Sequence, residues 1–363
     1  MNRRFFLSTA ALLSLPPKVL GAPMTDLVEV YKKQLPPNYG PGAVLQVQAV
    51  PQLKGTRLTG RVLTLHDKQT LGALFAPLGP VENQLQSFPY REMGAASYGV
   101  LTAQRSDMRS QADAASELVS QAVLGDTVLL LSQTKDWYEI LRQWDGYVGW
   151  VPKADLKTLD QNQLRQWRAQ SRQMLLKDTP IGFAGSILTG KTAPDRRPLV
   201  ETLSPSQMRE RVLTHAQALY EHSRVEPFPY LWGGTYGTAL DCSGFTQTVY
   251  RLAGLAIPRD TYQQLAFGEQ IKATPVRLDL LLPGDLVFFS ENSRRATHVG
   301  IYMGEGMLYH SSGSKGNRGL DRNNLRGDLP YEAFLRRIWW GVARFIPAEG
   351  TTPIGTQGLF LDS

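Results

Sequence analysis

One cysteine, Cys242, stands alone in a chain of 363 residues. A lone cysteine can neither close a disulfide within the chain nor build a cysteine-rich zinc site. The 42% of hydrophobic residues are ample for a large buried core, which excludes a disordered chain or a disulfide-stapled miniprotein. Cys242 is therefore either an incidental buried thiol or a group that does chemistry.

The N-terminus has the order of segments found in an export signal. Arg3 and Arg4 come directly before Phe-Phe-Leu, an apolar run follows as far as Leu15, and small residues precede the exit near Ala22. The paired arginines also resemble a twin-arginine leader. The apolar run is broken by two prolines and is shorter than the ~20 residues that a membrane-spanning helix needs. We expect residues 1–22 to be an export signal, leaving a protein of the periplasm or cell wall with no stable membrane span.

The next part of the chain predicts β structure in two segments. Short apolar stretches cut by proline and glycine make residues 23–95 a β-rich segment, with a divergent SH3-like domain as one interpretation. Over residues 96–157, four or five strand-like runs make a small barrel, and Asp145-Gly146 between aromatic-rich runs predicts a hairpin turn. The run WYEI…DGYVGWVP resembles the bacterial SH3-like domains of cell-wall enzymes.

Residues 158–206 predict a helix followed by a polar linker, and residues 348–363 a flexible tail. The basic residues of the helix are typical of a solvated helix face, so we expect no nucleic-acid partner. The net charge of +7 suits an anionic wall polymer but equally suits other acidic surfaces. The sequence makes no prediction of the oligomeric state.

The segment around Cys242 predicts a helix that begins at or near the thiol. Phe245, Val249 and Leu252 recur at helical spacing after it and mark one apolar face. The unsatisfied backbone N–H groups and the positive end of the helix dipole favour a thiolate, so we expect a lowered pKa for Cys242. The same N–H groups could hold an oxyanion.

Two histidines lie on a predicted hairpin farther along the chain. Centring the hairpin on Gly304 places His298 opposite His310 on one sheet face, with Cβ atoms about 5 Å apart. A base and its orienting partner would then lie together, with the Cys242 helix packed across that face. The alternatives are a structural histidine pair or a metal site. Because no carboxylate or thiolate stands at ligand spacing, we expect no metal and no other cofactor.

The runs PYLWGG, DCSGF, LPGDLVFF, THVGIYMG and YHSS, in this order, resemble the NlpC family of papain-like cell-wall cysteine peptidases over residues 207–347. The resemblance implies an α+β fold, with the Cys helix packed on an antiparallel sheet in a papain-like domain that follows one or two small SH3-like β-barrels. It implies that Cys242 is the nucleophile, His298 the general base and His310 the residue that orients the base.

The resemblance also implies residues that bind substrate. Tyr230 would shape the oxyanion and substrate site, and the other implied contacts are Asp241, Ser243, Asp260, Thr261 and Tyr147. Such relatives carry an acidic residue shortly before the Q-A-x-x-G-D run, which holds the free amine of a stem peptide. The best register places Val119 there, with Glu117 two residues away.

The implied reaction is hydrolysis of peptidoglycan stem peptides, at the bond between γ-D-glutamate and the diamino acid, through a thioester on Cys242. Two other functions stay open at this stage. One is a wall-binding protein with an inactive peptidase domain. The other is a thiol acyltransferase or amidase that acts on a different amide or ester.

Overall fold

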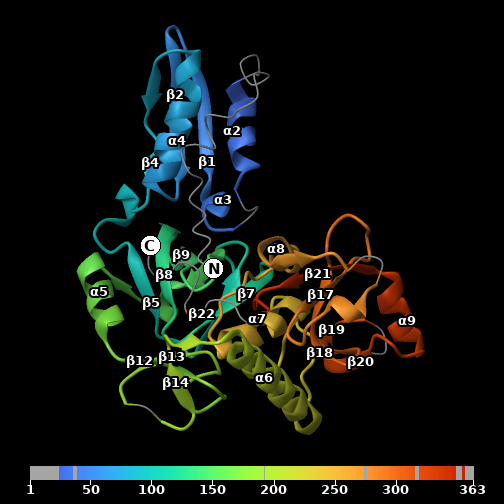
Figure 1. Ribbon diagram of the computed structural model, residues 1–363. Helices are drawn as coiled ribbons and strands as arrows, with labels where there is room; N and C mark the ends of the chain where they lie inside the picture. Colours follow the sequence, from blue (N-terminus) through green and yellow to red (C-terminus); the bar gives the residue numbers. More distant parts are fainter. Residues whose placement is uncertain are drawn as a thin grey trace. The chain divides into compact units, whose positions relative to one another are not determined.

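The computed structural model describes residues 24–35, 39–191, 193–273, 276–314, 319–348 and 354–355. The expected export signal at residues 1–22 and nearly all of the expected tail lie outside these residues. The chain divides into two compact units between Gly94 and Ala95 (Figure 1). Among the described residues, no helix has the length and apolar character needed to cross a bilayer.

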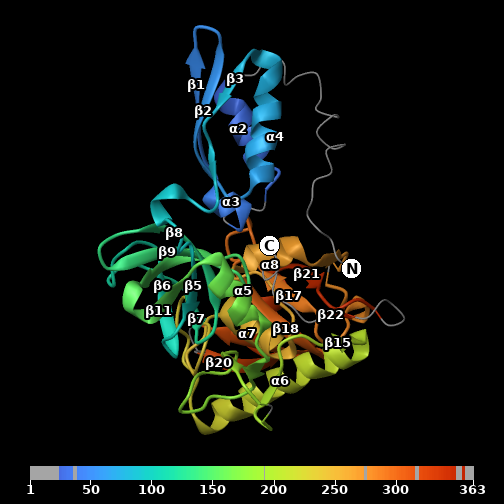
Figure 2. The same ribbon diagram turned by 90° about the vertical axis from the view of Figure 1, so that its left-hand side faces the viewer.

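The first unit is a mixed sheet that shares one core with two helices. Its elements are α2 (Met24–Lys32), α3 (Pro41–Val44), β1 (Gln46–Gln52), β2 (Gly55–Val62), α4 (Leu65–Phe75), β3 (Val81–Asn83) and β4 (Gln86–Ser87). Strand β1 pairs antiparallel with β2, whereas β3 and β4 pair parallel with it. Helices α2 and α4 pack against the strands (Figure 2). Tyr31 of α2, Leu58 of β2 and Phe75 of α4 belong to the same buried cluster.

This architecture departs from the β-rich, SH3-like segment expected over residues 23–95. A local signal for α4 is present in the sequence: Thr64 accepts a hydrogen bond from the Asp67 N–H, while Asp67 accepts one from the Thr64 N–H. Such a reciprocal cap fixes a helix start. The prolines and glycines of residues 23–95 separate the elements of a sheet that contains parallel strand pairs. They do not mark the turns of a barrel of antiparallel hairpins.

The second unit begins with the expected small β domain. Its strands are β5 (Tyr98–Leu101), β6 (Arg105–Arg109), β7 (Leu118–Val123), β8 (Thr127–Gln133), β9 (Trp137–Arg142), β10 (Val148–Pro152) and β11 (Leu156–Leu159). They form one antiparallel seven-stranded sheet in the order β11-β5-β8-β9-β10-β6-β7. The predicted turn at Asp145-Gly146 joins β9 to β10, and Gly146 adopts a φ of +75°.

The expected linker after this domain is instead a packed substructure. It contains α5 (Gln161–Ala169), β12 (Arg172–Leu175), β13 (Ile187–Thr189) and β14 (Arg196–Pro198), and the three strands form a sheet of their own. Met174 and Ile187 share a buried cluster with Trp144 of the β domain and Leu252 of the C-terminal domain. The polar composition of residues 158–206 suggests a linker. The apolar residues that this segment packs against lie far away in the sequence, so a local pattern does not reveal them.

The C-terminal domain is a six-stranded antiparallel sheet with helices packed on it. Its helices are α6 (Pro205–Val225), α7 (Cys242–Ala253), α8 (Thr261–Phe267) and α9 (Pro330–Arg337). The sheet order is β16 (Glu269–Ile271), β21 (Trp339–Arg344), β17 (Leu286–Phe289), β18 (His298–Gly304), β19 (Met307–Ser312) and β20 (Gly319–Asn324). A short pair, β15 (Thr202–Leu203) with β22 (Ile354–Gly355), lies outside it.

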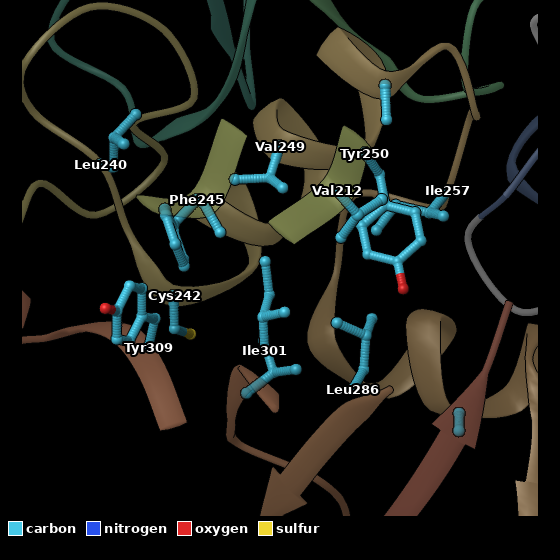
Figure 3. Packing of buried hydrophobic residues seen from close by; sticks show 14 of the residues in the cluster. Val212, Leu240, Cys242, Phe245, Val249, Tyr250, Ile257, Leu286, Ile301 and Tyr309 are labelled. Carbon is cyan, nitrogen blue, oxygen red and sulfur yellow. The ribbon is translucent and has the colours of Figure 1, made fainter. Parts of the chain in front are cut away.

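The two faces of this sheet carry different buried clusters. Cys242 and Phe245 of α7 pack with Leu286 and Ile301 on one face (Figure 3). Phe289, Tyr302 and Leu308 pack with Leu335 of α9 in a separate cluster. Because successive side chains of a strand point to opposite faces, this division fixes where each residue of β18 and β19 points.

Candidate active site

Cys242 is the first residue of α7, as the apolar spacing predicts. The side chain of Asp241 caps the helix by accepting a hydrogen bond from the Gly244 N–H at 2.7 Å. The thiol is buried, with 5% of the residue exposed. Its Sγ lies 3.7 Å from Oγ1 of Thr261 and receives hydrogen bonds from the Tyr230 hydroxyl and the Val299 N–H.

The pKa of Cys242 is raised, contrary to the sequence-based expectation. Burial is the main cause and the Asp241 carboxylate adds to it, so that the pKa rises to about 11. The Thr261 hydroxyl and the Val299 N–H lower it, but by less. In a dry site the cost of desolvating a thiolate exceeds the stabilisation that one helix end provides. The raised pKa favours the neutral thiol in the free protein.

The two predicted histidines are in direct contact. Nε2 of His298 lies 2.7 Å from Nδ1 of His310, and the ring planes stand at 76° to each other. Burial lowers the pKa of His298 well below its ordinary value, and His310 lowers it further. Burial also lowers the pKa of His310. Both shifts favour the neutral imidazole, and His298 Nδ1 is the ring nitrogen not engaged with His310.

The predicted register of the hairpin is wrong by two residues. The turn is formed by Glu305 and Gly306, both with positive φ, and Ile301 pairs with Tyr309. His310 therefore lies diagonally across from His298 and not directly opposite it. A shift of two residues keeps both side chains on one face of the sheet, which is why the contact survives the error.

The predicted packing of the Cys helix against the histidine face is also wrong. Val299 packs in the cluster that contains Cys242, so the neighbouring His298 points to the other face. There the ring of His298 lies 5.8 Å from that of Phe289. The thiol approaches the base at the end of the strand: the Val299 N–H that binds Sγ belongs to the residue directly after His298. Among the described residues, Sγ is hydrogen-bonded to these neighbours and not to the imidazole itself.

Two of the predicted pocket residues are held by an arginine that sequence reasoning missed. Arg259 donates to both carboxylate oxygens of Asp241, at 2.7 and 3.1 Å, and to the Ser243 hydroxyl at 2.8 Å. Its Nε donates to Ser120 of the β domain at 3.2 Å. All of these side chains are buried. The only sequence signal for Arg259 is its place directly before Asp260 in the run IPRDTYQQ.

The β domain contributes to the same site. Tyr147 donates from its hydroxyl to Oδ1 of Asp260 at 3.2 Å, at the start of α8. Burial raises the pKa of Asp260, and Arg259 opposes this effect. The structure therefore brings Tyr147, Asp260 and Thr261 to the region of Cys242 from segments far apart in the sequence.

Glu117 contacts the loop that carries Tyr230. Oε1 of Glu117 accepts a hydrogen bond from Nε1 of Trp232 at 2.7 Å. Nearby, Gln121 accepts hydrogen bonds from the backbone N–H groups of Thr235 and Tyr236 at 3.0 and 3.1 Å. The acidic side chain on this edge of the β domain is thus two residues from the position that the register favoured.

No group of three or more His, Cys, Asp or Glu side chains that could bind a metal occurs in the part of the chain that the structure describes. What the arrangement offers is a thiol bound by the N–H of the residue directly after His298, and a second imidazole in contact with that of His298. That set can carry out nucleophilic catalysis with general acid and base assistance.

Parts of this chain are similar in sequence to known proteins. Residues 227–337 match the NlpC/P60 family, and residues 108–156 match the bacterial dipeptidyl-peptidase SH3 domain. A γ-D-glutamyl-L-lysine dipeptidyl-peptidase of Bacillus cereus is 29% identical over 260 residues, which cover 61% of this chain and 76% of that protein. The enzyme of the same name from Bacillus subtilis is 44% identical over 86 residues, which cover 23% of this chain and 27% of that protein.

A crystal structure of an NlpC/P60 family protein from Bacillus cereus has the same fold. It superimposes with a TM-score of 0.56 at 20% identity, over 69% of this chain and the whole of that chain. The expected α+β architecture, with an SH3 domain before a papain-like domain, is thereby confirmed. Residues 227–337 of this chain are thus similar to the NlpC/P60 family, and residues 108–156 are similar to the bacterial dipeptidyl-peptidase SH3 domain.

Proposed function

We propose that this protein is an exported cysteine peptidase that hydrolyses peptidoglycan stem peptides at the bond between γ-D-glutamate and the diamino acid. The observation that carries the proposal is the His298–His310 pair at the strand end where the Cys242 thiol is bound. The substrate comes from the relatives, two of which are named γ-D-glutamyl-L-lysine dipeptidyl-peptidases.

In this mechanism the thiol and the base begin as a neutral pair. Nδ1 of His298 takes the proton of Cys242 as Sγ attacks the carbonyl carbon of the scissile amide. The Tyr230 hydroxyl and the N–H groups at the start of α7 stabilise the oxyanion. His298 then gives the proton to the leaving amine, which leaves a thioester on Sγ. Finally, His298 activates a water molecule that hydrolyses the thioester.

The residues around the nucleophile fall into two groups in this proposal. Tyr147, Asp260 and Thr261 contact the acyl part of the substrate. Thr261 lies 3.7 Å from Sγ, and Tyr147 is hydrogen-bonded to Asp260, the residue directly before Thr261. Asp241 and Ser243 act through Arg259, because their oxygens are already bound to its guanidinium. They hold the first turn of α7 in place and thereby fix the position of Sγ.

Export is part of the proposal, since peptidoglycan lies outside the cytoplasm. The support is the arginine pair, apolar run and small-residue exit of residues 1–22. Comparing the size of the full-length protein in whole cells with that of the protein released from the periplasm tests this part. A single unprocessed form that stays with the cytoplasmic fraction would contradict it.

The test of the function is incubation of the purified protein with defined muropeptides, followed by chromatography and mass spectrometry. We expect a new free amine on the diamino acid and a matching product that ends in γ-D-glutamate. Cys242→Ala should form neither product, while Ser293→Ala, on the exposed loop before β18, should behave like the wild type. Binding to sacculi without cleavage by the wild type would overturn the proposal in favour of a wall-binding protein.

A further inference from the structure

We propose that Asn323 of β20 is a positioning residue that fixes the tautomers of both histidines and so leaves the lone pair of His298 Nδ1 free for the thiol proton. The inference rests on the proposed function, because it assigns a role within that reaction. Asn323 is thus a fourth residue in the series Cys242, His298 and His310.

Asn323 is placed for this role by the pairing of β19 with β20. His310 pairs with Asp321, so Asn323, two residues farther along, points to the same face. Its Oδ1 lies 2.8 Å from Nε2 of His310. The His310 ring is fully buried and stacks on Tyr331 at 6.0 Å with an interplanar angle of 9°. The ring is therefore held in one orientation.

The proton positions follow from what each atom can donate. A neutral imidazole has one N–H and one lone pair, and an amide oxygen only accepts. With Oδ1 of Asn323 facing it, Nε2 of His310 carries the proton, and its Nδ1 holds a lone pair. That lone pair accepts the Nε2–H of His298. Nδ1 of His298 is then unprotonated, which is the state that a general base needs.

The opposite amide orientation would block the reaction. If the NH2 group of Asn323 faced His310, Nδ1 of His310 would carry the proton and donate it to Nε2 of His298. Nδ1 of His298 would then hold a proton and could not accept that of the thiol. One orientation of a single amide therefore decides whether His298 can act as the base.

The neutral character of Asn323 matters as well. The groups that face His310 are His298 of β18, Tyr331 of α9 and, from β20, Asn323 and the charge of Asp321. A carboxylate at position 323 would favour the His310 imidazolium, which donates from both nitrogens. Nε2 of His298 would then have to accept, which again protonates the wrong nitrogen.

Two variants and one control test the inference. Asn323→Leu should lower kcat about tenfold and leave KM unchanged, as expected for the loss of one buried hydrogen bond behind the base. Asn323→Asp keeps the size of the side chain and should shift the acid limb of the pH–kcat profile to higher pH. Asn324→Ala is the matched control, because its side chain accepts from the Arg326 N–H and does not contact His310. It should retain the wild-type profile.

The tautomers can also be measured without substrate. Nitrogen-15 NMR of histidine-labelled Cys242→Ala protein should show a proton on Nε2 and a lone pair on Nδ1 in both His298 and His310. In Asn323→Asp, the His310 signals should change to those of an imidazolium at neutral pH. A wild-type pH profile in both Asn323 variants, or a proton on Nδ1 of His310 in the unmodified network, would overturn the inference. A wild type that cleaves no muropeptide would instead refute the function and leave the tautomer result intact.

Discussion

The alkylation rate of Cys242 should depend on pH as expected for a neutral thiol. Burial and Asp241 raise its pKa to about 11, from a reference value of 9.0. The thiolate fraction at pH 7 is then about one in ten thousand, compared with about one in a hundred at the reference pKa. Because only the thiolate reacts, iodoacetamide should modify Cys242 about a hundredfold more slowly than a free thiol of reference pKa, before any further slowing by burial.

The assay is the increase in protein mass during reaction with iodoacetamide, with a small free thiol measured in parallel. The rate should rise about tenfold for each pH unit up to about pH 10, without a plateau. Asp241→Asn is the informative variant. It keeps an oxygen to cap α7, removes the charge that raises the pKa and leaves Arg259 nearby, so it should react faster. A rate that is independent of pH above about pH 6 would refute the reasoning, since it would show a thiolate–imidazolium pair in the free protein.

Three further outcomes follow from the structure. Arg259→Met leaves the Asp241 charge buried without its partner, so urea unfolding should show a loss of about 3–5 kcal/mol, and unchanged stability would contradict the role of the ion pair. Gly233→Ala would place a Cβ 2.3 Å from the Leu118 carbonyl oxygen, at a residue with a φ of +78°. We expect a lower Tm by calorimetry and a reduced kcat. A wild-type Tm would show that the loop accommodates the extra atom without strain. Treatment with EDTA should leave muropeptide cleavage unchanged, because the candidate chemistry uses a thiol and two imidazoles; activity lost to the chelator and restored by zinc would contradict this.

Local sequence patterns were sufficient to predict where α7 begins and where the β9–β10 turn lies. Apolar residues at helical spacing placed the start of α7 at Cys242, and the structure has it there. The Asp145-Gly146 pair placed the β9–β10 turn correctly. These features depend on residues close together in the chain, where spacing and turn chemistry act directly.

The register of the histidine hairpin was harder, because its turn contains more than one glycine. Gly304, Glu305 and Gly306 all adopt positive φ, so the residue pattern does not mark one centre. The two-residue error left the parity of the strands intact, and the two imidazoles still meet. The face on which α7 packs could not be derived from strand alternation alone, since both faces of the sheet are buried.

Long-range contacts account for most of what the sequence did not predict. The raised pKa of Cys242 depends on burial that only the complete domain produces. Arg259 reaches Ser120 of the β domain across 139 positions of sequence, and Tyr147 reaches Asp260 across 113. No spacing rule covers such distances, so Tyr147 and Asp260 were reached through family resemblance, and Arg259 was not reached at all.

In the proposed reaction, Cys242 forms a thioester with the γ-D-glutamyl part of a stem peptide. Mixing the protein with a muropeptide, quenching in acid and measuring the intact and digested masses tests it directly. We predict an added mass equal to the acyl portion that ends in γ-D-glutamate, located on the peptide that contains Cys242 and absent from Cys242→Ala. Cleavage that proceeds in Cys242→Ala, or an acyl group found on another residue, would contradict the claim.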